Sequence, residues 1–407
     1  MQLAEVNALS PENVENPYAL YQLLRDESPV HWDANLEVLL VSRYDDVASV
    51  LRDPATFSSA VGAMTKAPPI EAIEIIANGH PPANTLITAD PPVHGGYRSL
   101  VARAFTPRRV EKLREHVREV AHELIDAFVA SGRVELVHEF SAPLPLTIIA
   151  EQLGVPRSRV SDFKKWSDAF MDFIGGLASE ERSIQCAHEI IECQSYFDSR
   201  IEEYRSDPQD DILGVLLRAK LRGERPLDNP EVCSILQQFM LAGNETSTAA
   251  IAATWRFLLE QSDILDAVKR DRSLIPAVCE EIFRLESPVQ NMFRLSTRDC
   301  EIAGVPVPAG TKIAVMFGAA NRDPRAFPDP DRIDPHRSNV REHMAFGHGN
   351  HFCIGAGLAR LEACVALDTL LDRLENVRFA PGSNDFSHNP MFIARGLRYL
   401  HLEFDAR

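Results

Sequence analysis

The amino-acid sequence predicts a mainly α protein with small β-sheets, folded as one continuous body. Apolar residues recur three and four positions apart through most of residues 106–208, which is the spacing of amphipathic helices. Another helical pattern fills residues 229–261, far longer than the mean helix of about 11–12 residues. Strand patterns are short and lie towards the two ends of the chain. No linker rich in glycine, serine or proline divides the 407 residues.

Composition and charge exclude several classes of protein. The chain has 42 basic and 59 acidic residues and a net charge of −17, which argues against nucleic acid as a partner. No apolar run approaches the roughly 20 residues that span a bilayer, and the polar segment 1–17 has the pattern of neither a signal peptide nor a membrane anchor. The seven cysteines are scattered without a CxxC pair, which indicates neither a zinc site nor a disulfide framework. We therefore expect a cytoplasmic monomer.

The first hundred residues predict a small sheet followed by an irregular stretch. Two short strands, Val30–Trp32 and Glu37–Val41, precede a helix at Tyr44–Leu51. From residue 57 to 92 only Ile70–Ala77 has a helical pattern, because the rest is punctuated by Gly62, Pro68, Pro69, Gly79, Pro81, Pro82, Pro91 and Pro92. A loop this long in a compact body is usually functional or mobile.

The central part predicts helices at 110–130, 144–153, 160–177 and 184–204. In the third of these an aromatic stripe at helical spacing indicates core more often than a ligand pocket; it comprises Phe163, Trp166, Phe170, Phe173 and Ile174. Strands are expected again within residues 301–316, at Val377–Phe379 and at Met391–Phe404.

The helix predicted at 229–261 carries polar residues at its centre. Asn229 is suited to cap it, and Pro230 to its first position. Gly243 costs about 1 kcal/mol relative to alanine in a helix interior, and Thr246 can bond back to the carbonyl four residues earlier. Gly243 and Thr246, with Glu245 between them, predict a groove in the helix that has a hydroxyl and a carboxylate beside it.

Cys353 lies in a loop with glycines at positions 347, 349, 355 and 357, directly before a helical pattern. Unpaired N–H groups at a helix start favour a thiolate. Such a thiolate can be a nucleophile or an axial ligand of an iron porphyrin, and a buried structural cysteine is the plain alternative. A dinucleotide loop is excluded, because neither glycine pair is followed by a third glycine three residues later. His351 is placed to reach an anionic group beside the cysteine.

The pattern Phe346-x-x-Gly349-x-His351-x-Cys353-x-Gly355 resembles the haem-binding loop of the cytochrome P450 superfamily. The run from Ala242 to Thr246 is similar to the distal-helix motif of that family, Ala-Gly-x-Glu/Asp-Thr. The resemblance covers about residues 17–404 and implies one P450 domain over 1–407. It also implies a triangular helical body, with haem between the long distal helix and the helix that follows the cysteine loop.

The resemblance assigns roles to individual residues. By spacing alone His94 and Arg98 would be a solvated pair on one helical face. The resemblance implies instead that they hold a haem propionate and that Arg294 holds a second. The implied haem-contacting set is His94, Arg98, Ala242, Arg294, Phe346, His351, Cys353 and Gly355, with Cys353 as the iron ligand. The implied catalytic set is Gly243, Glu245 and Thr246.

Two further sets follow from the same resemblance. Glu281 and Arg284 are three residues apart on one helix, and with Arg337 they are expected to form a buried structural ion pair. The expected substrate pocket consists of Phe239, Ala242, Val289, Asn291, Met292, Phe293, Met391 and Phe392, beneath the 57–90 loop. Its lining is mostly apolar, which suits a terpenoid, a steroid, a fatty acyl chain or an aromatic molecule.

The implied activity is that of a haem-thiolate monooxygenase that uses haem b and O2 to hydroxylate an apolar small molecule. Electrons would come from NAD(P)H only indirectly, through a separate ferredoxin or flavodoxin and its reductase. Arg103, Arg108, Arg109 and Lys112, with Arg341 and Arg360, are expected to form a basic docking patch for that partner. The alternatives are a peroxide-dependent peroxygenase of the same fold and a non-catalytic haem-binding protein.

Overall fold

A computed structural model describes residues 6–61, 64–65, 67–80 and 83–407. The expectations placed on Gly62, Pro81 and Pro82 therefore lie outside the described residues, as do residues 1–5. None of the helices in the described ranges is both long enough and apolar enough to cross a membrane.

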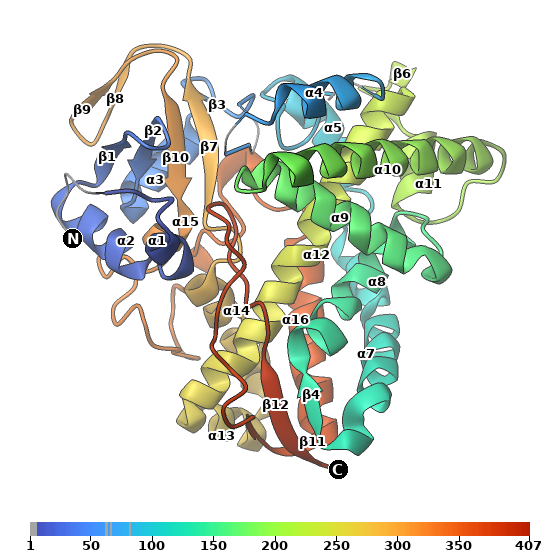
Figure 1. Ribbon diagram of the computed structural model, residues 1–407, viewed down its shortest axis with the longest axis vertical. Coiled ribbons are helices and arrows are strands. Elements are labelled where there is room, and N and C mark those ends of the chain that lie inside the picture. The colour runs from blue at the N-terminus through green and yellow to red at the C-terminus, as the bar shows by residue number, and fades with distance from the viewer. Residues whose placement is uncertain (1–5, 62–63, 66, 81–82) are drawn as a thin grey trace.

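The long predicted helix is α12, Asn229–Glu260, which runs obliquely through the middle of the molecule (Figure 1). Its N-cap is Asp228 rather than the expected Asn229. The Asp228 side chain accepts from the Glu231 N–H and the Glu231 side chain accepts from the Asp228 N–H, which forms a capping box. Asn229 carries an equally suitable side chain, but Pro230 is already the second helical residue, which leaves Asp228 at the cap position.

Helices surround α12 on most sides. The predicted central helices are present as α7 (Arg114–Phe128), α8 (Pro143–Gln152), α9 (Val160–Gly175) and α10 (Glu180–Ser206). α8, α14 (Ile275–Glu286) and α16 (Ala356–Arg373) pack against α12, while α10 packs on α9. In α9, Phe163 and Trp166 are fully buried, so the aromatic stripe contributes to the core as predicted.

The remaining helices are short. They are α1 (Pro11–Glu15), α2 (Tyr18–Glu27), α3 (Tyr44–Arg52), α4 (Ile70–Ala77), α5 (Val93–Val101), α6 (Pro107–Lys112), α11 (Ile212–Arg218), α13 (Ser262–Arg270) and α15 (Phe317–Ala320). The predicted helices at Tyr44–Leu51 and Ile70–Ala77 are thus confirmed as α3 and α4. The helix that contains His94 and Arg98 is α5, which ends at Val101.

The largest sheet has the strand order β1-β2-β10-β7-β3, in which only the β2–β10 pair is parallel. Its strands are β1 (Val30–Asp33), β2 (Val38–Val41), β3 (Phe57–Ser58), β7 (Asn291–Ser296) and β10 (Lys312–Met316). β1, β2 and β10 were predicted. β7 was missed, because four of its six residues are buried and its pattern therefore lacks the alternation of a half-exposed strand.

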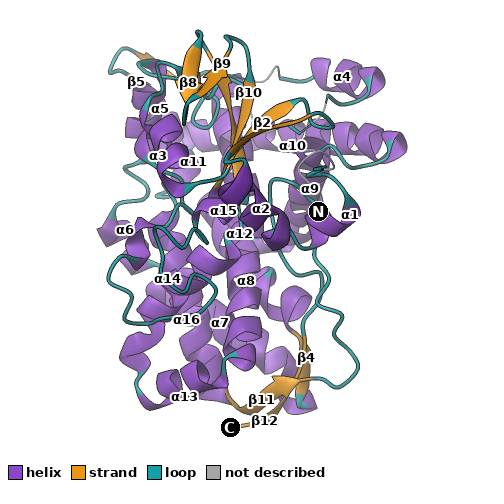
Figure 2. Cartoon of the chain, turned by 90° about the vertical axis from the view of Figure 1, so that its left-hand side faces the viewer, coloured by secondary structure: helices purple, strands orange, loops and turns teal. Residues whose placement is uncertain are grey.

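The other sheets are small. The three-stranded sheet has the order β11-β12-β4, with β4 at Arg133–Glu135, β11 at Leu374–Phe379 and β12 at His401–Ala406. Two hairpin ribbons pair β5 (Lys220–Leu221) with β6 (Arg225–Pro226), and β8 (Cys300–Ile302) with β9 (Val305–Val307). The strand expected from Met391 begins only at His401, because residues 391–400 pair through isolated bridges. Figure 2 shows the five-stranded and three-stranded sheets at opposite ends of the body.

The fold class is the predicted one, mainly helical with small sheets. The body is broad at the end that holds α10 and the five-stranded sheet, and it narrows towards β11 and β12 (Figure 1).

A buried ion-pair cluster joins α14 to the extended segment that leads to the cysteine loop. Arg284 donates to both carboxylate oxygens of Glu281 at 2.7 and 3.0 Å, and both side chains are fully buried. Arg337 donates to the same carboxylate at 3.0 Å. The spare guanidinium donors of Arg284 bind the backbone carbonyls of Asn321, Pro330 and Arg332. The structure thus brings Glu281, Arg284 and Arg337 together as expected, and the cluster anchors the segment.

Candidate active site

The loop that carries Cys353 is tightly shaped by two of its glycines. Gly347 and Gly349 have φ values of +69° and +67°, in the left-handed region that favours glycine. A Cβ on Gly349 would also lie 2.8 Å from the Leu51 carbonyl oxygen of α3. The Cys353 N–H donates to the Phe346 carbonyl at 2.7 Å, which turns the chain back before α16 begins at Ala356.

A cavity with about 1440 Å³ of empty space, its solvent-open mouth included, separates this loop from α12. Cys353 and Phe346 line one wall, while Ala242, Gly243 and Thr246 of α12 line another. The cavity therefore lies between the cysteine loop and the centre of the long helix, and side chains from both contact it.

Four cationic or hydrogen-bonding side chains line the same cavity: His94 and Arg98 from α5, Arg294 from β7, and His351. Arg98 donates to the Phe352 carbonyl at 2.6 Å. Arg294 is buried and donates to the carbonyl of its neighbour Phe293 at 2.7 Å. Burial lowers the pKa of Arg294 to about 10, so it stays charged at neutral pH. Within the described residues, neither arginine forms an ion pair with a carboxylate.

The rings of His94 and His351 contact each other, with centroids 4.2 Å apart and planes tilted by 38°. Burial is the main reason that the pKa of His351 falls to about 3, and the nearby His94 lowers it further. His351 is therefore neutral at pH 7, with Nε2 3.1 Å from the Ser59 hydroxyl. His351 can therefore offer a hydrogen bond to a bound anion but no positive charge. The positive charge in this part of the cavity comes from Arg98 and Arg294.

Removal from water raises the pKa of the Cys353 thiol, although the N–H groups of Gly355 and Ala356, Arg98 and Arg360 act in the opposite direction. The expectation that the helix start alone would favour a thiolate is therefore wrong, because burial outweighs the helix N–H groups. A thiol of this kind is a poor free nucleophile at neutral pH. Coordination to a metal ion deprotonates it, so the site suits a metal ligand better than a nucleophile.

These residues fit haem, on their chemistry and placement. Cys353 offers the thiolate ligand, and the apolar walls suit a porphyrin. Arg98 and Arg294 are buried or half-buried cations that lack carboxylate partners in the described part of the chain, which matches the two carboxylates of protoporphyrin.

The centre of α12 contributes a hydroxyl and a close helix contact. The Thr246 hydroxyl donates to the Ala242 carbonyl at 2.8 Å, which is the back-bond that the sequence predicts. A Cβ on Gly243 would lie 2.9 Å from Cγ1 of Ile149 on α8. Gly243 therefore lets α8 and α12 approach closely, in addition to lining the cavity.

Glu245 does not line the cavity. Its carboxylate faces α9, 3.7 Å from the Lys164 amine and 3.3 Å from the Asn244 amide. Burial raises the pKa of Glu245, while Lys164 opposes the shift. Lys164 also pairs with the more exposed Asp168, so Lys164 and Asp168 together connect Glu245 to the surface.

The acid that does line the cavity is Glu362 of α16, which sequence reasoning missed. It accepts a hydrogen bond from the Ser247 hydroxyl at 2.7 Å, and Ser247 also lines the cavity. Glu362 is 1% exposed, and burial raises its pKa to about 8 despite that hydrogen bond. Its position four residues after Leu358, on the apolar face of a helical pattern, was the available signal.

The expected substrate-pocket residues divide into two groups. Phe239, Ala242, Val289 and Met292 line the large cavity, as do Leu86, Ile87 and Ile149. Asn291, Phe293, Met391 and Phe392 are absent from its lining. On β7 successive side chains face opposite sides of the sheet, so Met292 and Arg294 face the cavity while Asn291 and Phe293 face away.

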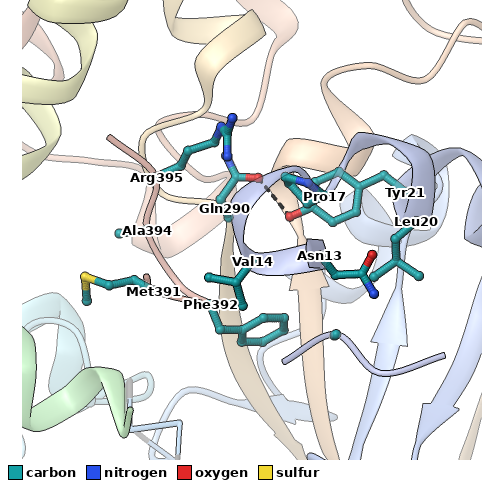
Figure 3. A pocket seen from close by; sticks show the side chains of 11 residues that line it. Asn13, Val14, Pro17, Leu20, Tyr21, Gln290, Met391, Phe392, Ala394 and Arg395 are labelled. Carbon is teal, nitrogen blue, oxygen red and sulfur yellow. Dashed lines mark hydrogen bonds between the residues drawn. The ribbon is translucent and has the colours of Figure 1, made fainter. Parts of the chain in front are cut away.

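The group that faces away is packed around Phe392. The Asn291 amide donates to the Phe392 carbonyl at 2.7 Å, and the rings of Phe293 and Phe392 are 6.3 Å apart. Met391 and Phe392 line a separate, smaller pocket of about 300 Å³ beside α1 and α2 (Figure 3). There the Tyr21 hydroxyl donates to the Gln290 side chain at 2.8 Å.

The chain is similar to known proteins over nearly its whole length. It is 34% identical to "6-deoxyerythronolide B hydroxylase" of Saccharopolyspora erythraea, over 95% of this chain and 96% of that one. The structure of cytochrome P450 CYP109Q5 from Chondromyces apiculatus matches with a TM-score of 0.88 and 37% identity, covering all of both chains. CYP109E1 from Bacillus megaterium, in complex with corticosterone, matches with a TM-score of 0.84 and 33% identity, over 96% and 99% of the two chains.

The sequence model of the family described as "Cytochrome P450" matches residues 153–391, and other relatives carry the names of monooxygenases and hydroxylases. Three observations point to the same family. The cysteine loop lies opposite a long helix with a central threonine, two arginines lie at the edge of the cavity, and the similarity extends along the entire chain. The chain belongs to the cytochrome P450 family of monooxygenases.

Proposed function

We propose that the whole chain is one haem-thiolate monooxygenase domain that hydroxylates an apolar small molecule, using O2 and two electrons from a separate ferredoxin. The observation that carries the proposal is a single cavity with Cys353 on one wall, Thr246 on another, and the cations of Arg98 and Arg294 at its edge. When bound, haem b would supply O2 activation and the insertion of one oxygen atom into a C–H bond.

The residues of the chain then have distinct tasks. Cys353 would ligate the iron, and Arg98 and Arg294 would each bind a propionate, with His94 and His351 adding hydrogen bonds. Apolar side chains such as Phe239, Val289 and Met292 would orient the substrate and exclude water.

Proton supply requires a hydroxyl and an acid near the reacting oxygen. Thr246 offers a hydroxyl oxygen that can accept a hydrogen bond while its proton is held by the Ala242 carbonyl. Glu362, with a pKa of about 8, is mostly protonated at pH 7 and can release a proton through the Ser247 hydroxyl. Glu245 would serve as a second route, which exchanges protons with solvent past Lys164 and Asp168.

The proposed electron donor is a ferredoxin or flavodoxin that is itself reduced from NAD(P)H. Arg103, Arg108, Lys112 and Arg341 are exposed, which supports an acidic partner. The patch is smaller than expected from the sequence, because Arg109 pairs with Asp210 and Arg360 pairs with the buried Glu280.

The proposed substrate is a bulky apolar molecule, of the size of a steroid or a macrolactone. The mostly apolar lining of the cavity supports an apolar substrate. Similarity to a protein named a 6-deoxyerythronolide B hydroxylase and to a structure that holds corticosterone supports it further.

The test is reconstitution with a spinach-type ferredoxin, its reductase, NADH or NADPH, and a panel of steroids and macrolactones. The proposal requires that product forms, with oxidation of NADH or NADPH, only when this protein, the ferredoxin and the reductase are all present. Product formed with hydrogen peroxide alone at a comparable rate would favour a peroxygenase. Haem binding without product from any panel member or electron source would favour a binding protein.

A further inference from the structure

Three different metal-ligating side chains meet away from the large cavity, where the loop after α4 lies against α10 and α12. His80 Nε2 is 2.8 Å from each carboxylate oxygen of Asp198, and Cys233 Sγ is 4.0 Å from Asp198 Oδ1. One ligand atom from each of the three lies within 4.8 Å of the other two. Their positions in the sequence are more than 30 residues apart, so no spacing motif could reveal the group.

The fold holds all three side chains in place. Asp198 and Cys233 lie on two packed helices, α10 and α12. The His80 N–H donates to the Gln194 side chain of α10 at 2.9 Å, and the Gln194 amide donates back to the His80 carbonyl at 3.3 Å. A Cβ on Gly79 would lie 2.1 Å from Oε1 of Gln194, so the glycine permits this close approach.

We propose that His80, Asp198 and Cys233 bind one Zn²⁺ ion, with a water molecule as fourth ligand. Zinc accepts nitrogen, oxygen and sulfur ligands at about 2.0–2.3 Å in a tetrahedral arrangement. Ligand atoms around such an ion are about 3.3–3.7 Å apart, so the present separations, none above 4.8 Å, need to change by at most about 1.5 Å. Cys233 is buried, whereas the side chains of His80 and Asp198 are 25% and 39% exposed, which gives the ion a path from solvent.

Binding exchanges the ion for a proton. Cys233 is buried, and a cysteine thiol without a metal ion is protonated at neutral pH. Zinc ligation forms the Zn–S bond and releases that thiol proton to solvent. His80 would ligate the ion through Nε2, so the ring proton that faces Asp198 from that nitrogen moves to Nδ1, and the thiol accounts for one proton released for each ion bound.

The ion would hold one end of a segment whose other end lies in the wall of the large cavity. Leu86 and Ile87, a few residues after His80, line that cavity. Their end of the segment is fixed to α12, because the Ile87 N–H donates to Gln238 at 2.9 Å and Gln238 bonds Thr85. Zinc at His80 would fix the end nearer α4.

The first experiment is calorimetric titration of the chelator-treated holoprotein with Zn²⁺, in two buffers of different ionisation enthalpy. We expect one ion bound and one proton released per chain. Cys233→Ser and His80→Gln should each weaken binding at least about tenfold, and Cys233→Ser should abolish proton release. The matched controls are Cys186→Ser and His188→Gln, which change the same residue types on α10, outside the proposed site. Circular dichroism checks that each variant is folded.

Equal zinc affinity in folded Cys233→Ser, His80→Gln and control variants would overturn the proposal, and so would binding without proton release. Limited proteolysis gives an independent readout. Zinc should protect the segment between α4 and α5 from cleavage in the unmodified protein and in both controls, but not in Cys233→Ser. Protection that is the same with and without Cys233 would also refute the site.

Discussion

Glu362→Gln tests the buried acid that the structure places on the wall of the cavity. Glutamine has nearly the shape of a protonated glutamic acid and can still accept from the Ser247 hydroxyl, which lies 2.7 Å away in the unmodified protein. With a pKa of about 8, roughly 90% of Glu362 carries its proton at pH 7. We therefore expect the variant to fold, to bind haem and to bind substrate normally.

The variant has no acidic proton to give. Proton transfer by a positioned side chain contributes typically 100- to 10,000-fold, so product formation should fall by up to that range, and less if the Glu245 route carries part of the flux. Glu245→Gln is the matched comparison, because it removes an acid that lies outside the cavity lining. Product, hydrogen peroxide and NADH are counted together in the reconstituted system.

The pH dependence of stability gives a second measurement of Glu362. Its folded pKa, about 8, lies above the usual value of 4.5, so the native state holds the proton more tightly than the unfolded chain. Stability from this group is therefore fully present below pH 4.5 and is lost as the pH rises towards 8. The loss is about 1.4 kcal/mol per pH unit within that window. Glu362→Gln should remove this slope from the unfolding free energy.

Two observations would refute this reasoning. One is an infrared spectrum in which Glu362→Gln removes no band of a protonated carboxyl at pH 7, since that would mean Glu362 is ionised. The other is an unchanged product rate in Glu362→Gln, which would show that the Ser247–Glu362 contact is structural only.

Three further predictions concern the remaining parts of the site. Cys353→Ala should abolish the red-shifted Soret band of the reduced, CO-bound protein, whereas Cys364→Ala should keep it. The opposite result would identify Cys364 as the iron ligand. Thr246→Ala should leave haem and substrate binding intact but divert electrons from product to hydrogen peroxide, and unchanged coupling would mean that this hydroxyl only packs. Charge reversal in the double variant Arg108→Glu/Lys112→Glu should slow reduction by ferredoxin at low salt. It should also make the reduction rate less dependent on salt, because salt screens exposed charges beyond roughly 8 Å. An unchanged rate would place the docking surface elsewhere.

Local patterns were sufficient for much of the fold. α3, α4 and α12 were predicted within a few residues, because each has an uninterrupted helical pattern. β7 was not predicted, since burial on both faces hides its alternation. Local pattern also fails near the end of the chain. The sequence of residues 391–400 predicts a strand, but only isolated bridges form there.

The site was harder to predict, because it depends on which way each side chain points. On α12 the residues Thr246 and Ser247 line the cavity, whereas Glu245 lies on another side of the helix and faces Lys164. Glu362 becomes a cavity residue only because α16 packs against α12, which is a long-range contact. Motif resemblance located Cys353 and Thr246, but the ionisation of Cys353 depends on burial that no motif encodes.

The contact between Gly349 and Leu51 has a consequence for biosynthesis. The cysteine loop rests on the end of α3, where Arg52 also donates to His348 at 3.1 Å, although these two residues are 296 positions apart in the sequence. As the chain leaves the ribosome, the N-terminal sheet and α3 emerge long before the loop does. The loop must therefore join a segment that was synthesised much earlier, and an error in that early region would leave Cys353 misplaced. Cofactor loading would then report that the two distant parts of the nascent chain have been joined correctly.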